Sequence, residues 1–247
     1  MKNSVSCFLQ FHSAQHEKRT KKEKKEIQER NTNKKKRMLL PNTFFVLFCI
    51  LTSVSSSSSI VSVTKLLESN VDSAVIKEKT RVKIGDKDFG YSGHFTTNRG
   101  MEIENHIFFW FQPCRNCTME KSELLVWLQG GPGGAGTFGA MTEVGNWYVQ
   151  NGTAKERCFS WCEQYSCLFV DQPVESGFSY QTDSDGNPIV EMKRLNLTDT
   201  SPDAMRQIHS VISQFLDVFS ELRPVPLIIT GESYGGLYTP NLGVLLA

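Results

Sequence analysis

Long apolar runs are scarce in this 247-residue chain. The longest uninterrupted one extends from Phe44 to Leu51, whereas a membrane-spanning helix needs about 20 consecutive apolar residues. The chain also lacks a second C-x-x-C pair, or a pair of histidines, that could complete a zinc site with Cys114 and Cys117. We therefore expect no permanent membrane span, no metal and no other cofactor.

An excess of positive charge is missing from the main part of the chain. Residues 1–37 hold 12 Lys and Arg against 4 Glu, and residues 38–59 carry no charge. Residues 60–247 consequently hold 15 basic and 22 acidic side chains. A nucleic-acid-binding domain carries its basic excess on the folded domain, so the sequence predicts no nucleic-acid partner.

A leader precedes the acidic body. A basic run, the apolar stretch that ends at Leu51 and five serines up to Ser59 follow one another, which is the layout of a secretory signal peptide. We interpret residues 38–59 as that signal and expect translation to start at Met38, with residues 1–37 as an untranslated basic extension. The alternative is that the lysine-rich half of this extension is a genuine basic arm.

Cysteines and glycosylation patterns favour an oxidising compartment. Five cysteines follow the leader, and because an odd number cannot all pair, we expect disulfides with at least one partner outside the given sequence. N-x-T acceptor patterns at Asn116, Asn151 and Asn196 predict N-glycosylation.

Apolar periodicity predicts an α/β protein. A helix is expected from an N-cap at Ser201 onward, because apolar residues recur there at three- and four-residue spacing up to Leu222. Another helix is expected at 237–246. A long helix between apolar strands indicates a crossover connection, hence a mainly parallel central sheet with flanking helices. Strands are expected at 89–95, 106–111, 124–128, 168–170 and 227–229.

A G-x-S-x-G pattern, Gly231 to Gly235, stands between a predicted strand and a predicted helix. In that context the serine occupies the apex of a sharp turn, and glycines flank it because a Cβ would not fit there. Ser233 is therefore the candidate nucleophile, with the start of the next helix close to a developing oxyanion. The alternative is a glycine-rich turn around a buried serine.

A second glycine-rich loop, Gln129 to Gly133, follows the predicted strand 124–128. Its exposed backbone N–H groups suit a second oxyanion donor. A phosphate-binding loop would instead show G-x-G-x-x-G or end in G-K-[ST], and neither pattern is present. An anion cradle for a tetrahedral intermediate is the better match.

Three blocks resemble the signature sequences of the serine carboxypeptidases. They are Trp127 to Gly133, Val170 to Tyr180 and Thr230 to Gly236. The resemblance implies that residues 60–247 are the N-terminal part of an α/β-hydrolase domain. It also implies an enzyme that releases C-terminal residues from peptides through an acyl-enzyme at acidic pH. Its substrates would be peptides with a free C-terminal carboxylate, and its location a lysosome, a vacuole or the extracellular space.

The resemblance assigns roles position by position. Ser233 matches the nucleophile, and the backbone N–H groups of Gly131 and Tyr234 match the oxyanion hole. Four residues match the site for the substrate's terminal carboxylate: Gln129, Gly130, Glu143 and Glu232.

Three positions depart from the family pattern. Gln129 stands where many members have Asn, with an amide one methylene further out. Gly134 stands where many members have a disulfide-bonded Cys, so that disulfide is absent. Glu175 replaces a frequently small residue, a change that the sequence does not explain.

Glu143 and Glu232 suggest a single cause for two expected properties of the enzyme: its preference for the C-terminal residue of a peptide and its activity at acidic pH. If they face each other, both cannot ionise comfortably, so one keeps its proton. A protonated acid can donate a hydrogen bond to a peptide's carboxylate, whereas an ionised one repels it. The alternative makes Glu143 a solvated loop residue.

The acid and the histidine of a Ser-Asp-His triad do not follow Ser233 in this sequence. His94, His106 and His209 precede it. We interpret His209, inside the predicted long helix, as structural, and expect none of the three to be the general base. We therefore expect a truncated and poorly active chain with a sheet incomplete at its C-terminal side. Two further hypotheses are a carboxypeptidase-like acyltransferase and a non-catalytic secreted glycoprotein.

Overall fold

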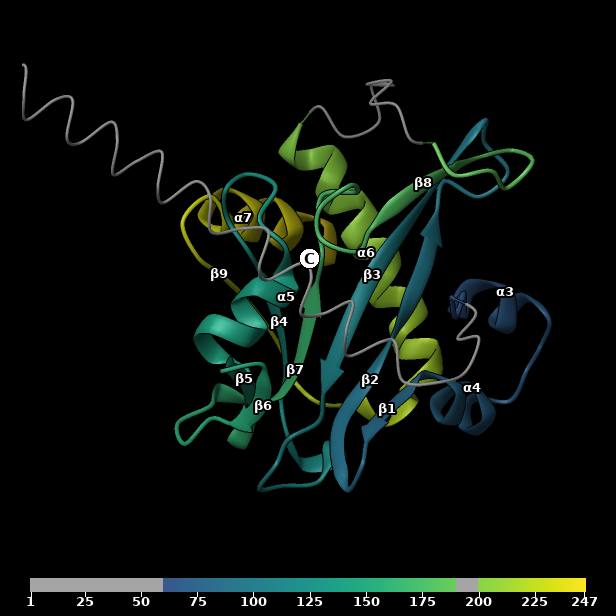
Figure 1. Ribbon diagram of the computed structural model, residues 1–247. Coiled ribbons are helices and arrows are strands. Elements are labelled where there is room, and N and C mark those ends of the chain that lie inside the picture. Colours follow the sequence, from purple (N-terminus) through teal and green to yellow (C-terminus); the bar gives the residue numbers. More distant parts are fainter. Residues whose placement is uncertain (1–59, 190–199) are drawn as a thin grey trace, which may run out of the picture. The chain divides into compact units, whose positions relative to one another are not determined.

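The computed structural model describes residues 60–189 and 200–247 (Figure 1). The predicted signal peptide, the basic extension and the acceptor Asn196 lie outside these residues. The helices of the described part are α3 (Val63–Glu68), α4 (Ser73–Thr80), α5 (Gly136–Gly139), α6 (Ser201–Val218) and α7 (Gly235–Leu246). The strands are β1 (Arg81–Ile84), β2 (Lys87–Thr97), β3 (Ile103–Gln112), β4 (Leu124–Leu128), β5 (Trp147–Gln150), β6 (Thr153–Glu156), β7 (Ser166–Val170), β8 (Tyr180–Asp183) and β9 (Leu227–Gly231).

The central sheet is mixed. Its order is β1-β2-β3-β7-β4-β9, and β8 pairs with the first half of β3. Pairing is antiparallel from β1 to β7 and parallel between β7, β4 and β9. The expected mainly parallel sheet therefore holds for three strands only. The reason is that short turns join β1, β2 and β3, and a short turn can join only antiparallel neighbours.

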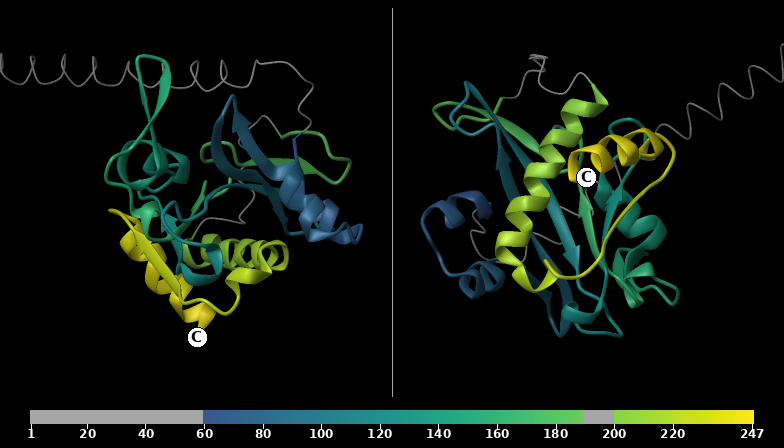
Figure 2. Two further views of the ribbon diagram at one scale, coloured as in Figure 1. Left: turned by 90° about the horizontal axis from the view of Figure 1, so that it is seen from below. Right: turned by 180° about the vertical axis from the view of Figure 1, so that it is seen from behind.

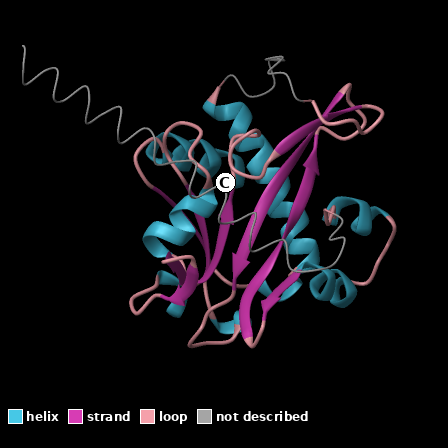
Figure 3. Cartoon of the chain, viewed as in Figure 1, coloured by secondary structure: helices cyan, strands magenta, loops and turns pink. Residues whose placement is uncertain are grey.

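Both faces of the sheet are covered by apolar packing. Along β4, Leu124, Val126 and Leu128 belong to one buried cluster, whereas Leu125 and Trp127 belong to another. Side chains alternate between the two faces of a strand, so the first cluster packs against α6 and α7 and the second against the α5 side. Figure 2 shows α6 crossing one face of the sheet, and Figure 3 shows the strands between the helical layers. This layering confirms the predicted α/β class.

The long helix α6 forms as its periodicity predicts, with one correction. The N-cap is Thr200, whose side chain accepts a hydrogen bond from the N–H of Asp203, and Ser201 is the first helical residue. Thr200 has the extended backbone of a cap, and it sits one position before the serine that the sequence favoured. The inward face of α6 brings Phe215 against the sheet.

Two disulfides join residues of the described chain, Cys114 to Cys117 and Cys162 to Cys167, and Cys158 is free and exposed. The expected disulfide framework is thus present, and Cys114 and Cys117 are bonded to each other rather than available to zinc. Within residues 60–189 and 200–247, no helix has the length and apolarity that a bilayer crossing requires.

Candidate functional site

The turn between β9 and α7 places Ser233 at the surface. Ser233 is exposed and has φ of 55°, a left-handed conformation that costs a non-glycine residue energy and is typical of strained functional turns. A methyl group added at Gly231 would lie 2.8 Å from the carbonyl oxygen of Gly235, and one added at Gly235 would lie 2.4 Å from that of Leu128. The turn therefore needs both glycines, and the alternative of a buried serine is wrong.

The Gln129–Gly133 loop lies directly against this turn. A methyl group at Gly130 would be 2.8 Å from Ser233 Cβ and 2.8 Å from the backbone nitrogen of Tyr234. In the described chain, the backbone N–H groups of Gly131 and Tyr234 donate no hydrogen bond. The structure thus brings two unused donors to the surroundings of the candidate nucleophile, and their role as an oxyanion hole stays a prediction.

Two hydrogen bonds hold the loop in place. The Gln172 side-chain nitrogen donates to the carbonyl of Gln129 at 3.0 Å, and the N–H of Gly134 donates to the carbonyl of Gly130 at 2.8 Å. A side chain at Gly134 would meet that same carbonyl oxygen at 2.6 Å. Glycine at position 134 is therefore required by the closed form of this loop.

Gln129 connects the two carboxylates. Its Nε2 donates to Glu143 Oε1 at 3.3 Å and to Glu232 Oε2 at 3.1 Å. Trp127 Nε1 donates to Gln129 Oε1 at 2.9 Å, so the amide nitrogen faces the carboxylates. Glu143 is half-buried, and its bond to Gln129 contradicts the alternative that made it a solvated loop residue. One nitrogen thus brings Glu143 and Glu232 together beside Ser233.

Asp171, which the sequence analysis did not single out as a functional residue, ties two neighbouring loops together. It follows β7, is fully buried, and accepts hydrogen bonds from the backbone N–H groups of Thr137 at 2.8 Å and Phe178 at 3.0 Å. Burial raises the pKa of Asp171 to about 6, and these donated bonds oppose the rise. An Asp-Gln-Pro sequence directly after a buried strand was the signal that could have identified it.

Two buried histidines, His94 and His106, form hydrogen bonds with residues that are not proposed for catalysis. His106 bonds to the hydroxyls of Thr96 at 3.0 Å and Thr182 at 2.9 Å. His94 donates from Nε2 to the carbonyl of Phe178 at 2.9 Å, and burial lowers the pKa of His94 to about 4. These bonds fit the expectation that neither residue is the general base.

Three further predicted or unexplained positions are on the surface. Asn116 and Asn151 are exposed, so their glycosylation stays a prediction that the geometry permits. Glu175 is exposed with φ of 73°. Glycine adopts that conformation without strain, so Glu175 carries a backbone cost that nothing in the described residues explains.

Comparison with known proteins shows the family. The family model of the serine carboxypeptidases matches residues 84–247. The chain is 35% identical over 157 residues to the human probable serine carboxypeptidase CPVL, which covers 63% of this chain and 30% of that protein. It is 31% identical over 195 residues to the venom serine carboxypeptidase of Apis mellifera, covering 78% and 39%. The chain therefore belongs to the serine carboxypeptidase family.

A solved structure supports the fold. The prohormone-processing carboxypeptidase Kex1Δp from Saccharomyces cerevisiae superposes with a TM-score of 0.55 at 22% identity, over 69% of this chain and 38% of that one. This likeness shows the α/β-hydrolase fold. The chain spans between 30% and 39% of the length of the relatives named here.

Proposed function

We propose that this chain carries the nucleophile and the terminal-carboxylate site of an enzyme that releases C-terminal residues from peptides. The observation that supports this most directly is the bridging of Glu143 and Glu232 by the Gln129 amide next to an exposed Ser233. A substrate carboxylate needs hydrogen-bond donors, and Gln129, the backbone N–H of Gly130 and a protonated member of the carboxylate pair supply them.

In the proposed reaction, Ser233 Oγ attacks the last peptide carbonyl and forms an acyl-enzyme, while the departing amine takes up a proton. Water then releases the shortened peptide and restores the serine. The N–H groups of Gly131 and Tyr234 stabilise the oxyanion of each tetrahedral intermediate. The general base and its acid partner have no counterpart after Ser233 in this sequence, so the proposal is for an enzyme of its relatives' length.

Location and glycosylation belong to the same proposal. The disulfides of the described chain fit the secretory pathway, and one relative is named as a venom protein. We place the enzyme in a lysosome or vacuole or outside the cell, with glycans on Asn116, Asn151 and Asn196.

The carboxylate pair can be tested by Glu232→Gln in full-length active enzyme. The glutamine stays a neutral donor at every pH, so the ratio of kcat/KM at pH 7 to that at pH 5 should rise by about tenfold to 100-fold, because one titrating proton changes the activity by at most tenfold per pH unit and the interval spans two units. The matched variant Glu102→Gln, on an exposed turn, should leave the ratio unchanged. An unaltered pH profile for Glu232→Gln would eliminate the shared-proton mechanism.

The reaction class is tested separately. Ser233→Ala should lower peptide hydrolysis by about 10⁴-fold or more. Transfer of the acyl group to an added alcohol in preference to water would instead identify an acyltransferase. Failure of wild-type protein from the native source to react with a fluorophosphonate probe at Ser233 would favour a non-catalytic glycoprotein.

A further inference from the structure

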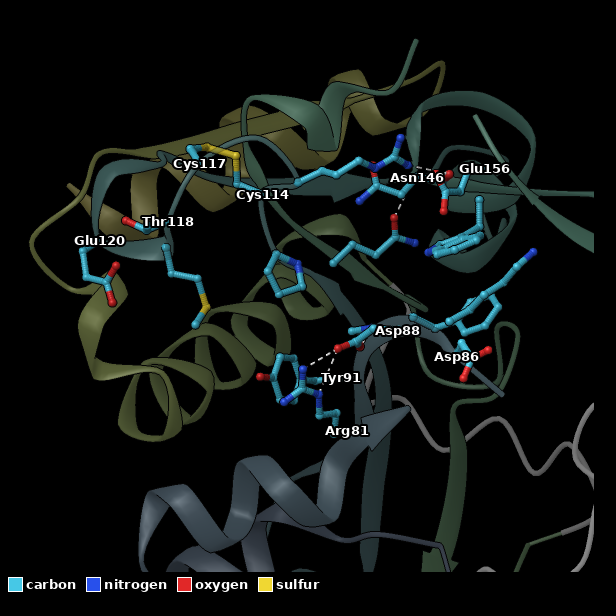
Figure 4. Close-up of a pocket in the computed structure, with 18 residues that line it drawn as sticks. Arg81, Asp86, Asp88, Tyr91, Cys114, Cys117, Thr118, Glu120, Asn146 and Glu156 are labelled. Atoms are coloured by element: carbon cyan, nitrogen blue, oxygen red, sulfur yellow. Dashed lines mark hydrogen bonds and ion pairs between the residues drawn. A yellow bond between two sulfur atoms is a disulfide. The ribbon is translucent and has the colours of Figure 1, made fainter. Parts of the chain in front are cut away.

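A cavity of about 660 Å³ opens at the end of the central sheet opposite to Ser233 (Figure 4). Gln112 at the end of β3 lines it and pairs with the start of β7, which lies beside the start of β4. Ser233 follows β9, whose last residue pairs with the end of β4. None of the residues proposed for catalysis lines the cavity, and its volume is typical of a small-molecule site.

Aromatic side chains form much of the wall. The rings of Phe89 and Trp147 lie with their centroids 4.4 Å apart, and both side chains are buried. Tyr91, Pro113 and Met119 add further apolar surface. The cavity therefore offers a good contact for an apolar or aliphatic stem.

The cationic side chains of the wall already have oxygen partners. Arg81 Nε donates to Asp88 at 3.0 Å. Lys87 Nζ donates to a backbone carbonyl of β6 at 2.9 Å, and Arg115 Nη2 donates to the carbonyl of Asn146 at 2.9 Å. Asp88 and Glu163 thus balance the charges of Arg81 and Arg115, whereas Lys87 keeps its positive charge beside a carbonyl and competes for the same acceptors.

Acceptors are left over on the same walls. The side chains of Asp86 and Glu156 have no ion pair or hydrogen bond with any residue of the described chain, and Glu156 lies directly across from Trp147 on the β5–β6 hairpin. The Oδ1 atom of Asn146, an acceptor, is buried without a partner, and so is one donor, the Nε2 atom of Gln112. Figure 4 shows Asn146 and Glu156 on one side of the open space, with Asp86 below them.

We propose that this cavity binds an organic cation, a guanidinium or primary ammonium group on an apolar stem. Its N–H groups would pair with Glu156 and Asp86 and supply a donor to Asn146, while its stem packs on Trp147. Lys87 is an internal precedent, because its Nζ lies 5.5 Å from the centre of the Trp147 ring. Within the described residues, no cluster of side chains could hold a metal ion, which favours an organic cation.

The charge requirement is testable with two probes of the same shape. N-acetyl-arginine N-methylamide and its citrulline analogue differ in charge but hardly in size. In calorimetric titrations of the full chain at pH 7 and low salt, the arginine probe should bind at least tenfold more tightly than the citrulline probe. Added salt should weaken the arginine probe further, because exposed charges are screened. Equal binding of both probes, or no binding of either, would overturn the proposal.

Matched variants test the location. Glu156→Gln should weaken the arginine probe about three- to fivefold, as the loss of one partly exposed ion pair predicts. Lys87→Gln should tighten it, because a competing cation is removed. Glu102→Gln makes the same charge change outside the cavity and should have no effect. An equal loss in Glu102→Gln and Glu156→Gln would show a nonspecific charge effect and reject the site.

The source of the cation is decided by a capped tri-arginine peptide. Binding more than tenfold tighter than the single residue assigns the site to basic peptides, and equal binding assigns it to small cations. Either result supports the cation site. None of these measurements depends on Ser233, so they can fail or succeed independently of the proposed peptidase activity.

Discussion

At Gly130, a single added methyl group would collide with Ser233, whereas at Phe215 a complete benzyl side chain is enclosed without exposed surface. The elbow end, where β4 and β9 finish, is built from close approaches of backbone to backbone. The antiparallel half, meaning strands β1 to β3 with the face of α6 that packs on them, is held together by large buried side chains. Phe215 of α6 packs against Phe111 at 4.9 Å and Phe219 at 4.6 Å between ring centroids.

This difference indicates that one region contributes mainly to folding stability and the other mainly to reactivity. Packed aromatic rings bury apolar surface, which is the main stabilising contribution to folding. Close backbone contacts at glycine contribute little to stability. They bring two chain segments close enough for an N–H group of each to reach the same oxyanion. Substitutions in the antiparallel half should therefore act on folding, and substitutions at the elbow end should act first on reactivity.

The largest expected effect tests the antiparallel half. Phe215→Ala should lower the free energy of unfolding by about 3–5 kcal/mol, the usual result of emptying a buried aromatic position. Phe159→Ala is the matched control, because that side chain is 89% exposed, and it should change stability by less than about 0.5 kcal/mol. Urea denaturation of both variants measures the contrast. An equal loss of unfolding free energy in the two variants would contradict the claim that burial of Phe215 stabilises the antiparallel half.

The next effect tests the elbow end. Gly130→Ala forces backbone atoms apart and should cost about 1–3 kcal/mol of stability, as overpacking usually does. It should also lower the reaction of Ser233 with a phosphonate probe in full-length enzyme by about 100-fold, the effect of losing one oxyanion donor.

Gly236→Ala is the control for Gly130→Ala, because nothing lies within 4 Å of an added methyl group there. It should keep full reactivity and leave stability unchanged or slightly higher, since alanine favours a helix over glycine. If Gly130→Ala reacted as fast as Gly236→Ala, the close approach would not matter for the chemistry.

The smallest expected effect concerns the pH dependence of stability. As pH falls, a buried group in one region destabilises the folded protein, whereas a buried group in the other region stabilises it. The pKa of His94, in the antiparallel half, is lowered to about 4, so the unfolded chain takes up a proton more readily. The stability that neutral His94 contributes is thus lost as pH falls from 6.5 through about 4. The pKa of Asp171, at the elbow end, is raised to about 6, so protonation there favours the folded state as pH falls from about 6 to about 4.

A variant that cannot titrate isolates the histidine contribution. His94→Gln should make the protein more stable at pH 4, relative to its stability at pH 7, than wild type is. Thermal unfolding of both proteins over this range measures it, and the Asp171 contribution cancels in the comparison. Parallel pH curves would show that burial of His94 has no effect on acid stability.

Local patterns predicted the elements that carry their own signal. The strand 124–128, the long helix after position 200 and the turn at Ser233 all form as expected. Each depends on apolar spacing or on glycine positions within a few residues of one another. The hairpin of β5 and β6 was missed because its strands are only four residues long and mostly exposed.

Long-range contacts were beyond these patterns. The Asp-Gln-Pro sequence marks Asp171, but nothing local identifies Thr137 and Phe178 as its donors. Likewise, nothing local pairs Cys162 with Cys167 rather than with Cys158. Glu143 and Glu232 were predicted to meet through a family resemblance, and Gln129 as their common donor is a finding of the structure.

The amino-acid sequence by itself determined the glycine-flanked serine, the main helices and the family, because these depend on residues adjacent in the chain. Only the tertiary structure decided which half of the sheet is antiparallel, which carboxylates share one amide and where a cavity with unpaired acceptors opens. The physical reason is that contacts between distant segments form only when competing ways of burying the same apolar faces have been excluded by packing of the chain as a whole.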